Sequence, residues 1–347
     1  MSRTTINDIA RISGFSKTTV SFAFNDPARI SARTRDKILK IADELGYVPD
    51  PVARNLSLKR QQTIGLLLPE VIAEAFLNPH LSEIVRGIGA VCEHHGYSLT
   101  LIPPIRKSLL EGIRGAAVDG LITVGLGPGM EAVEFIKRRH LPFVAIDERF
   151  DSDFPVVGID DKQAAATIMR HVLSLGHRDI VIVEFGSQPR LSVDPGVSPD
   201  RLAGYHEALR EVDPALVGAT AVVSATPSLD GGRQLVRTLV ANRSLPTALV
   251  AMSDILALGA MIELQSIGIN VPNDVTVVGF DDIPEAQLVR PQLTTISQPG
   301  YDKGLRAAES LMALIGNEVY LQHVCLEAVL MVRDSSAAPS GVSSILQ

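Results

Sequence analysis

The sequence predicts an all-α helix-turn-helix headpiece followed by an α/β body of two doubly wound parallel-sheet subdomains. Residues 1–48 carry three short helical patterns separated by turn residues. From Gln62 onward, short runs rich in Val, Ile and Leu alternate with helix-like stretches, and the alternation repeats after about residue 160. Such continuous apolar runs are typical of parallel strands that are buried on both faces.

Length and charge support a division into a head and a body. A chain of 347 residues exceeds one ordinary domain. The net charge of −7 is uneven, because residues 1–60 hold eleven Lys or Arg and six Asp or Glu. A basic head on an acidic body indicates that the head meets an anionic partner.

Neither a secretory signal nor a membrane span is expected. No apolar run at the N-terminus resembles a signal peptide, and no stretch of about 18 apolar residues occurs. We therefore expect a soluble, cytoplasmic protein. Its two cysteines, Cys92 and Cys325, are expected to be reduced and buried.

Three polar residues are expected to begin the three helices of the head. Thr5 and Ser16 can cap the first two helices, with Gly14 as a left-handed turn between them, and the second helix ends near Asn25. Ser31 can cap a third helix, which carries an apolar stripe. Two helices joined by a tight glycine turn form the helix-turn-helix pattern.

The outer face of the second helix is suited to reading DNA. Val20 lies on the inner face, which leaves Lys17, Thr18, Ser21 and Phe22 pointing outward. Lysine can donate to guanine O6 and N7, threonine can reach either base type, and serine suits a phosphate. Phe22 can lie against a thymine methyl group or a sugar. The alternative is a solvated helix face with one stray aromatic, which the basic three-helix context disfavours.

A short hinge helix is predicted between residues 49 and 61. Val52, Ala53 and Leu56 share one helical face after a proline start signal. One or two turns are unstable alone in water, so this helix is expected to fold only against a symmetry mate and DNA. A plain flexible linker is the alternative.

The body should consist of eight short strands with helices between them. The expected strands are "TIGLLLP", "SLTLIP", "GLITVG", "FVAID", "DIVIVEF", "ATAVVSA", "ALVAM" and "VTVVGFD". Helices are expected at 81–95, 130–140, 161–175, 200–210, 229–242 and 254–267. Ligands of doubly wound sheets bind near the carboxyl ends of the strands.

Polar residues that follow the strands are therefore candidates for a binding site. They are Asp147, Ser253, Asp254, Asp281 and Asp282, together with Arg201 at the start of a helix. A guanidinium fork binds paired hydroxyls or a carboxylate well, which makes Arg201 the sharpest candidate. For Asp254 and Asp282 we favour helix capping and packing.

Signals for catalysis are poor. The glycine-rich "VGLGPG" lacks the GxGxxG order of a nucleotide fingerprint and is expected to rim the cleft. His94 and His95 lack an HExxH frame, and we read them, like "LGHRD", as structural. No Ser/His/Asp or Cys/His set has a recognisable spacing. We expect no enzyme, no cofactor and no metal.

The blocks "TINDIARISGFSKTTVSFAFN", "GYVPDPVARNLS", "LGHRDIVIV", "ALVAMSDILALGAM", "VPNDVTVVGFDD" and "PQLTTISQP" occur in an order that resembles the LacI/GalR family of bacterial transcription regulators. The resemblance spans nearly the whole chain. It implies a body like that of periplasmic binding proteins, a homodimer on near-palindromic operator DNA, and a small-molecule effector. It also implies that Leu56 wedges into the minor groove while Val52 and Ala53 pack on the partner's hinge helix.

The resemblance assigns two sets of residues. The implied DNA-binding residues are Thr5, Ser16, Lys17, Thr18, Ser21, Phe22, Asn25, Val52, Ala53 and Leu56. The implied effector-binding residues are His80, Asp147, Arg201, Ser253 and Asp281. Three positions depart from the family pattern, since Phe22 stands where arginine is common, His80 where an aromatic normally lines the pocket, and Ser253 where asparagine is frequent.

The resulting domain plan has four parts. Residues 1–48 form the headpiece, 49–61 the hinge helix and linker, 62–334 the body, and 335–347 a small, polar tail expected to be disordered. The resemblance implies an N-subdomain of about 62–160 plus 293–322 and a C-subdomain of about 161–292 plus 323–334.

The predicted function is a sequence-specific repressor controlled by a sugar or sugar derivative. A purine- or nucleoside-responsive regulator of the same fold is the alternative. A solute-binding protein fits the body, but the basic head and the missing signal peptide disfavour it. An α/β enzyme is disfavoured by the lack of a catalytic constellation.

Overall fold

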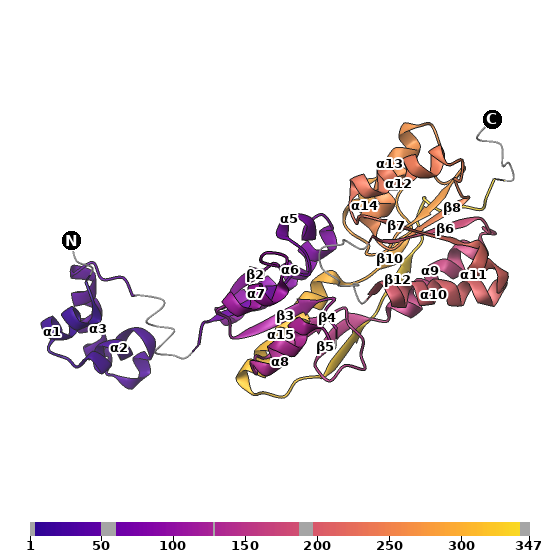
Figure 1. The fold of residues 1–347 in the computed structure, drawn as a ribbon. Helices are drawn as coiled ribbons and strands as arrows, with labels where there is room; N and C mark the ends of the chain where they lie inside the picture. Colours follow the sequence, from indigo (N-terminus) through magenta and orange to yellow (C-terminus); the bar gives the residue numbers. More distant parts are fainter. Residues whose placement is uncertain (1–3, 50–59, 128, 187–196, 341–347) are drawn as a thin grey trace. The chain divides into compact units, whose positions relative to one another are not determined.

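The computed structural model describes residues 4–49, 60–127, 129–186 and 197–340 (Figure 1). The chain forms two compact units, Met1–Gln62 and Thr63–Gln347. Within the described residues, no helix is both long and apolar enough to cross a membrane.

The first unit is the predicted three-helix head. Its elements are α1 (Ile6–Ser13), α2 (Lys17–Asn25), the short 3-10 helix η1 (Pro27–Arg29) and α3 (Ala32–Glu44). They enclose a small core of Ile9, Val20, Ala23, Ile38 and Ala42. The core is small because each helix contributes only one narrow apolar stripe.

The predicted helix caps are present in the head. The Thr5 amide and hydroxyl both donate to the Asp8 carboxylate, at 3.0 and 2.8 Å. The Ser16 hydroxyl accepts from the Thr19 amide at 3.1 Å, which satisfies one free donor at the start of α2. Gly14 ends α1 with a φ of 76°, a conformation that glycine adopts without steric cost. The helix-turn-helix geometry thus follows from local sequence signals.

The N-subdomain is a six-stranded parallel sheet in the order β11-β5-β4-β3-β1-β2. The strands are β1 (Thr63–Leu67), β2 (Ser98–Ile102), β3 (Gly120–Val124), β4 (Phe143–Ile146), β5 (Val156–Ile159) and β11 (His323–Leu326). One face packs on α6 (Pro79–His95) and α15 (Gly300–Gly316), and the other on α7 (Leu109–Gly115) and α8 (Glu131–Arg138). A short helix, α5 (Ile72–Ala75), follows β1.

The C-subdomain is a four-stranded parallel sheet in the order β7-β6-β8-β9. Its strands are β6 (Ile180–Phe185), β7 (Ala221–Ala225), β8 (Ala248–Ala251) and β9 (Thr276–Val278). α9 (Asp161–Ser174) and α10 (Val197–Val212) cover one face, and α12 (Leu229–Ala241) and α13 (Asp254–Ser266) cover the other. The remaining helices are α11 (Ala215–Ala219) and α14 (Glu285–Leu288).

The chain passes between the subdomains after β5, around β10 (Thr295–Ser297) and before β12 (Val329–Met331). β10 and β12 pair antiparallel, so the second and third crossings lie side by side. The expected boundary at residue 323 is corrected, because β11 pairs with β5 through His323–Val156 to Leu326–Ile159. The N-subdomain therefore extends to residue 326, and a four-residue strand at a sheet edge carried no sequence signal for this.

Close contact between α6 and α15 depends on two glycines. A Cβ at Gly87 would lie 2.0 Å from the Tyr301 carbonyl oxygen, and one at Gly304 would lie 2.0 Å from that of Ile84. Both distances are far below van der Waals contact, so neither position admits a side chain. This approach buries the adjacent face of α15.

Two further expectations, on the tail and on the cysteines, were wrong. The first part of the tail, residues 335–340, is ordered, because the fully buried Ser335 hydroxyl accepts from the Thr294 amide at 2.8 Å and donates to the Val277 carbonyl at 2.6 Å. Residues 341–347 lie outside the described residues. Cys325 is exposed, since β11 is an edge strand, whereas Cys92 is buried as expected.

Candidate functional site

A cavity of about 420 Å³ lies between the two subdomains. Asn78 and His80 at the start of α6, and Asp147 after β4, line it from the N-subdomain. Arg201 on α10 and Asp281 beyond β9 line it from the C-subdomain. A pocket at the carboxyl ends of parallel strands, walled by both subdomains, is where a doubly wound fold binds ligands.

Both aspartates have unusual backbone conformations. Asp147 and Asp281 have φ values of 58° and 132°, which side-chain-bearing residues rarely adopt. Such strain is concentrated at functional sites, where the surrounding fold holds a side chain in place. At both aspartates this conformation turns the backbone away from the strand direction where it reaches the cavity.

Arg201 is fixed in the cavity wall by three contacts. Its side chain is 3% exposed, and its Nε lies 2.7 Å from the Asp161 carboxylate. One terminal nitrogen donates to the Met252 carbonyl, and the guanidinium stacks 3.7 Å from the centre of the Phe280 ring. A buried charge tolerates burial only when paired in this way.

A buried lysine connects the aspartates on the two sides. The Lys303 ammonium group on α15 is fully buried and donates to the carboxylate of Asp147 and the side-chain carbonyl of Gln298. Because an ammonium group only donates, it fixes the orientation of the Gln298 amide, whose nitrogen then donates to Asp281. Asn78 donates to the second Asp281 oxygen at 3.4 Å. We call these five residues the polar relay.

His80 contributes a neutral imidazole. Burial, with a further contribution from the Lys303 charge, lowers the pKa of His80 to about 3. Its Nε2 is buried and has no hydrogen-bond partner within the described residues. A buried ring nitrogen without a partner is costly unless a ligand satisfies it.

The pKa of Asp281 is raised toward neutral pH. Burial raises its pKa to about 6, while Arg201 and the hydrogen bonds from Gln298 and Asn78 act in the opposite direction. A carboxylate with this pKa accepts hydrogen bonds at pH 7 and accepts a proton under mildly acidic conditions.

The structure brings four of the five expected effector residues together. His80, Asp147, Arg201 and Asp281 line the cavity. Ser253 does not line it: its side chain is fully buried, and its hydroxyl has no hydrogen-bond partner within the described residues. Gln298 and Asn78 also line the cavity without having been predicted, and so does Phe185, which the sequence offered as an aromatic that could stack on a sugar.

Asp254 and Asp282 make packing contacts, as favoured from sequence, but the favoured helix capping is not among them, since the N-cap of α13 is Ser253. Asp254 begins α13 and accepts from the Ile283 amide at 2.9 Å and from the Thr295 hydroxyl. Asp282 forms an ion pair with Arg333 at 2.6 Å. Neither lines the cavity between the subdomains.

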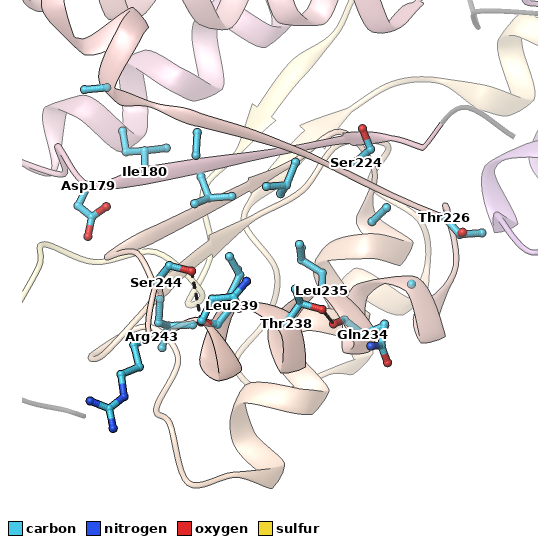
Figure 2. Close-up of a pocket in the computed structure, with 18 residues that line it drawn as sticks. Asp179, Ile180, Ser224, Thr226, Gln234, Leu235, Thr238, Leu239, Arg243 and Ser244 are labelled. Atoms are coloured by element: carbon cyan, nitrogen blue, oxygen red, sulfur yellow. Dashed lines mark hydrogen bonds between the residues drawn. The ribbon is translucent and has the colours of Figure 1, made fainter. Parts of the chain in front are cut away.

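A second cavity of about 660 Å³ lies between α12 and the β7 edge of the C-subdomain sheet. Figure 2 shows Asp179, Arg243 and Ser244 at one end and Thr226 and Gln234 at the other. Although it is larger, it lacks the converging buried polar groups that mark a ligand site. No group of three or more metal-ligating side chains occurs in the part of the chain that the structure describes.

The head presents the predicted polar face on α2. Lys17 and Thr18 are exposed, and Ser21, Phe22 and Asn25 are partly exposed. The Asn25 amide donates to the Ser21 hydroxyl at 3.2 Å, so these two side chains form one polar unit. The expected hinge residues Val52, Ala53 and Leu56 lie outside the described residues.

A helix-turn-helix head joined to a two-lobed α/β body with a central cavity defines a class of ligand-binding transcription regulators. Two family descriptions match the chain: bacterial regulatory proteins of the lacI family at residues 5–50, and the periplasmic binding protein-like domain at residues 169–336. A transcriptional regulator of Mycobacterium tuberculosis is 36% identical over 89% of this chain and 90% of its own length. The repressor CytR of Escherichia coli is 30% identical over 96% of both chains. The chain therefore belongs to the lacI family of bacterial regulatory proteins, whose members are transcription regulators with a DNA-binding head and a ligand-binding body.

Solved structures of ligand-binding transcription regulators share this fold. The lac repressor dimer bound to operator and an anti-inducer has a TM-score of 0.79 at 25% identity, covering 97% of this chain and all of that one. The complex of the regulator CelR with cellobiose has a TM-score of 0.68 at 28% identity, covering 96% of this chain and all of that one. The predicted family and fold class are confirmed.

Proposed function

We propose that this protein is a repressor that binds a near-palindromic operator as a homodimer in the cytoplasm, and that a neutral sugar or sugar derivative sets its operator affinity. The observation that supports this most is the convergence of His80, Asp147, Arg201 and Asp281 on one cavity. Similarity to an operator-bound repressor dimer and to a cellobiose complex supports the two partners.

The paired charges of Arg201 and Lys303 favour a neutral ligand, whereas Lys107, which also lines the cavity, is exposed. Arg201 is paired with Asp161, and Lys303 with Asp147. A phosphate or carboxylate entering the cavity would find these cations already neutralised, and its burial would be costly. Hydroxyl groups can instead donate to the carboxylates and satisfy the Nε2 of His80.

A thermal-shift screen of the purified protein tests the effector class. The panel contains cellobiose, ribose, other neutral sugars, their phosphates and nucleosides. A ligand that binds the folded state raises the melting temperature by mass action, by an amount that grows with its concentration. We expect a neutral sugar to act and its phosphate to have no effect.

Two variants locate the binding site. Asp281→Asn should abolish the shift, whereas Arg170→Ala, which breaks an exposed ion pair with Glu211 on the outer surface of the C-subdomain, should retain it. A nucleoside that alone raises the melting temperature would replace the sugar assignment. A shift that persists in Asp281→Asn would place the ligand elsewhere.

A further inference from the structure

An arginine that the sequence analysis did not single out lies against the recognition helix. Arg29 ends η1, and its guanidinium carbon lies 5.2 Å from the centre of the Phe22 ring. Its Nε lies 2.8 Å from the Asp26 carboxylate. One face and one edge of the guanidinium are thus held by neighbours from α2 and the residue that follows it.

The opposite edge of the guanidinium is available. The Arg29 side chain is 65% exposed. Within the described residues, Asp26 is its one ion-pair or hydrogen-bond partner. Arginine carries five N–H donors in one plane, and the two terminal nitrogens form the edge that pairs with O6 and N7 of guanine.

We propose that Arg29 is a specificity-determining residue that reads a guanine in the major groove, with Phe22 as its stacking platform and Asp26 as the carboxylate that fixes its rotation. Phe22 has no donor and cannot read guanine itself. Stacking and the ion pair order the long side chain before DNA arrives, which lowers the entropy cost of each base contact. This inference goes beyond the proposed function and needs no effector.

The carboxylate of Asp26 favours a base contact over a phosphate contact. A carboxylate beside the guanidinium cancels much of its charge and repels a phosphate. The edge of a guanine is neutral and is recognised by directed hydrogen bonds, so the same carboxylate improves the geometry at little electrostatic cost. The arrangement therefore suits reading of sequence.

The test starts from the preferred operator of the full-length protein, selected from a pool of randomised duplexes. Fluorescence anisotropy at one salt concentration then gives the affinity of each variant for this operator and for duplexes with single base-pair replacements. Arg29→Ala should lose about 10- to 100-fold in affinity for the operator. It should lose little for the duplex in which the guanine that Arg29 reads is replaced.

Further variants separate a base contact from charge and folding effects. Arg29→Lys keeps the charge but lacks the planar fork, so it should lose discrimination at that base pair while non-specific binding stays near the wild-type level. Asp26→Asn should bind all duplexes more tightly and discriminate less. Lys40→Ala removes one charge from α3 and should lower the affinity for every duplex by the same factor.

Two results would overturn the proposal. One is a uniform loss in Arg29→Ala across all duplexes, which identifies a phosphate contact. The other is a set of selected operators in which no guanine position loses its preference when Arg29 is changed. Unfolding curves of Arg29→Lys that match the wild type show that lost discrimination does not come from a damaged head.

Discussion

Lys303 forms a buried ion pair with Asp147, an aspartate that lines the cavity. Its ammonium group is fully buried and its carboxylate partner is Asp147. Removal of one member of a buried ion pair leaves the other without compensation, which costs about 3–5 kcal/mol. We therefore expect Lys303→Met to lower the free energy of unfolding by about that amount, as measured by urea denaturation of the full-length protein.

A double variant separates charge from shape in this prediction. Asp147→Asn combined with Lys303→Met removes both charges and should recover most of the lost stability. Arg170→Ala, in which the broken ion pairs are exposed, should cost less than about 1 kcal/mol. Equal losses in the single and double Lys303 variants would show that packing, and not the ion pair, sets the effect.

At this scale the sequence predicts the site residues that directly follow strands. Asp147 and Asp281 could be located because the carboxyl ends of parallel strands meet at one edge. Lys303 could not, because a lysine between aspartate and glycine in an amphipathic helix has the pattern of an exposed residue. Its burial follows from the glycine contacts between α6 and α15, which are set by residues some 200 positions apart. Ser253 also directly follows a strand, β8, but its side chain is fully buried and is not part of the cavity lining.

At the scale of elements, the C-terminal segment 335–340 is fastened by two histidines. The His177 ring lies 3.0 Å from the Thr247 hydroxyl, 3.1 Å from the Thr276 hydroxyl and 2.8 Å from the Ala337 carbonyl. His171 lies 3.0 Å from the Ser336 hydroxyl. Burial lowers the pKa of both rings below the ordinary value of 6.5.

The lowered pKa of His177 gives a signed pH dependence. The unfolded chain binds a proton at a higher pH than the folded chain, so acid favours unfolding. The stability that depends on neutral His177 is present above about pH 6.5 and is lost as the pH falls below it. We expect the free energy of unfolding to fall less between pH 7.5 and 5.5 in His177→Gln than in the wild type.

The wild type must be compared with His177→Gln at each pH, because a second group titrates in the same range. Burial raises the pKa of Asp281 to about 6, and this group acts in the opposite sense over the same range. The difference between wild type and His177→Gln at each pH cancels that contribution. Parallel curves for the two proteins would contradict the assigned role of His177.

Elements with long apolar runs were predicted well, and short or locally unmarked ones were not. The eight expected strands and six expected body helices are present because each buries a continuous run or a clear stripe. β10, β11 and β12 were missed because they pair with segments that are distant in sequence. The strand β5 and the helices α7 and α15 were not predicted either. The ordered part of the tail was missed because small polar residues are typical of both disorder and close packing.

At the scale of the molecule, the uneven charge predicts a steep salt dependence. Residues 1–60 are basic while the remainder is acidic. A dimer that neutralises about six phosphates would show a slope of about −5 when the logarithm of the binding constant is plotted against that of salt. Anisotropy titrations between 50 and 200 mM potassium chloride, a range over which the Debye length shortens, measure this slope. A flat profile would contradict binding through the basic head.

Regulation of the whole molecule requires that the cavity and the head share one equilibrium. A coupling of about 1–3 kcal/mol is typical, so the ligand found in the thermal screen should change operator affinity by about 5- to 150-fold. Linkage requires the operator to change ligand affinity by the same factor, because both measurements close one thermodynamic cycle. Titration of operator at saturating ligand, and of ligand at saturating operator, gives the two factors independently.

The polar relay supplies a variant that tests this coupling without removing a strand-end aspartate. Gln298→Leu breaks the link between Lys303 and Asp281, and so between the two subdomains, while both charged partners remain. We expect operator to bind this variant as it binds the wild type and ligand to bind it more weakly, because Gln298 lines the cavity, and we expect the two coupling factors to fall together toward one. Factors that stay equal to those of the wild type would show that the relay does not carry the coupling. Factors near one in the wild type itself would contradict effector control, even if the head binds DNA and the cavity binds a sugar.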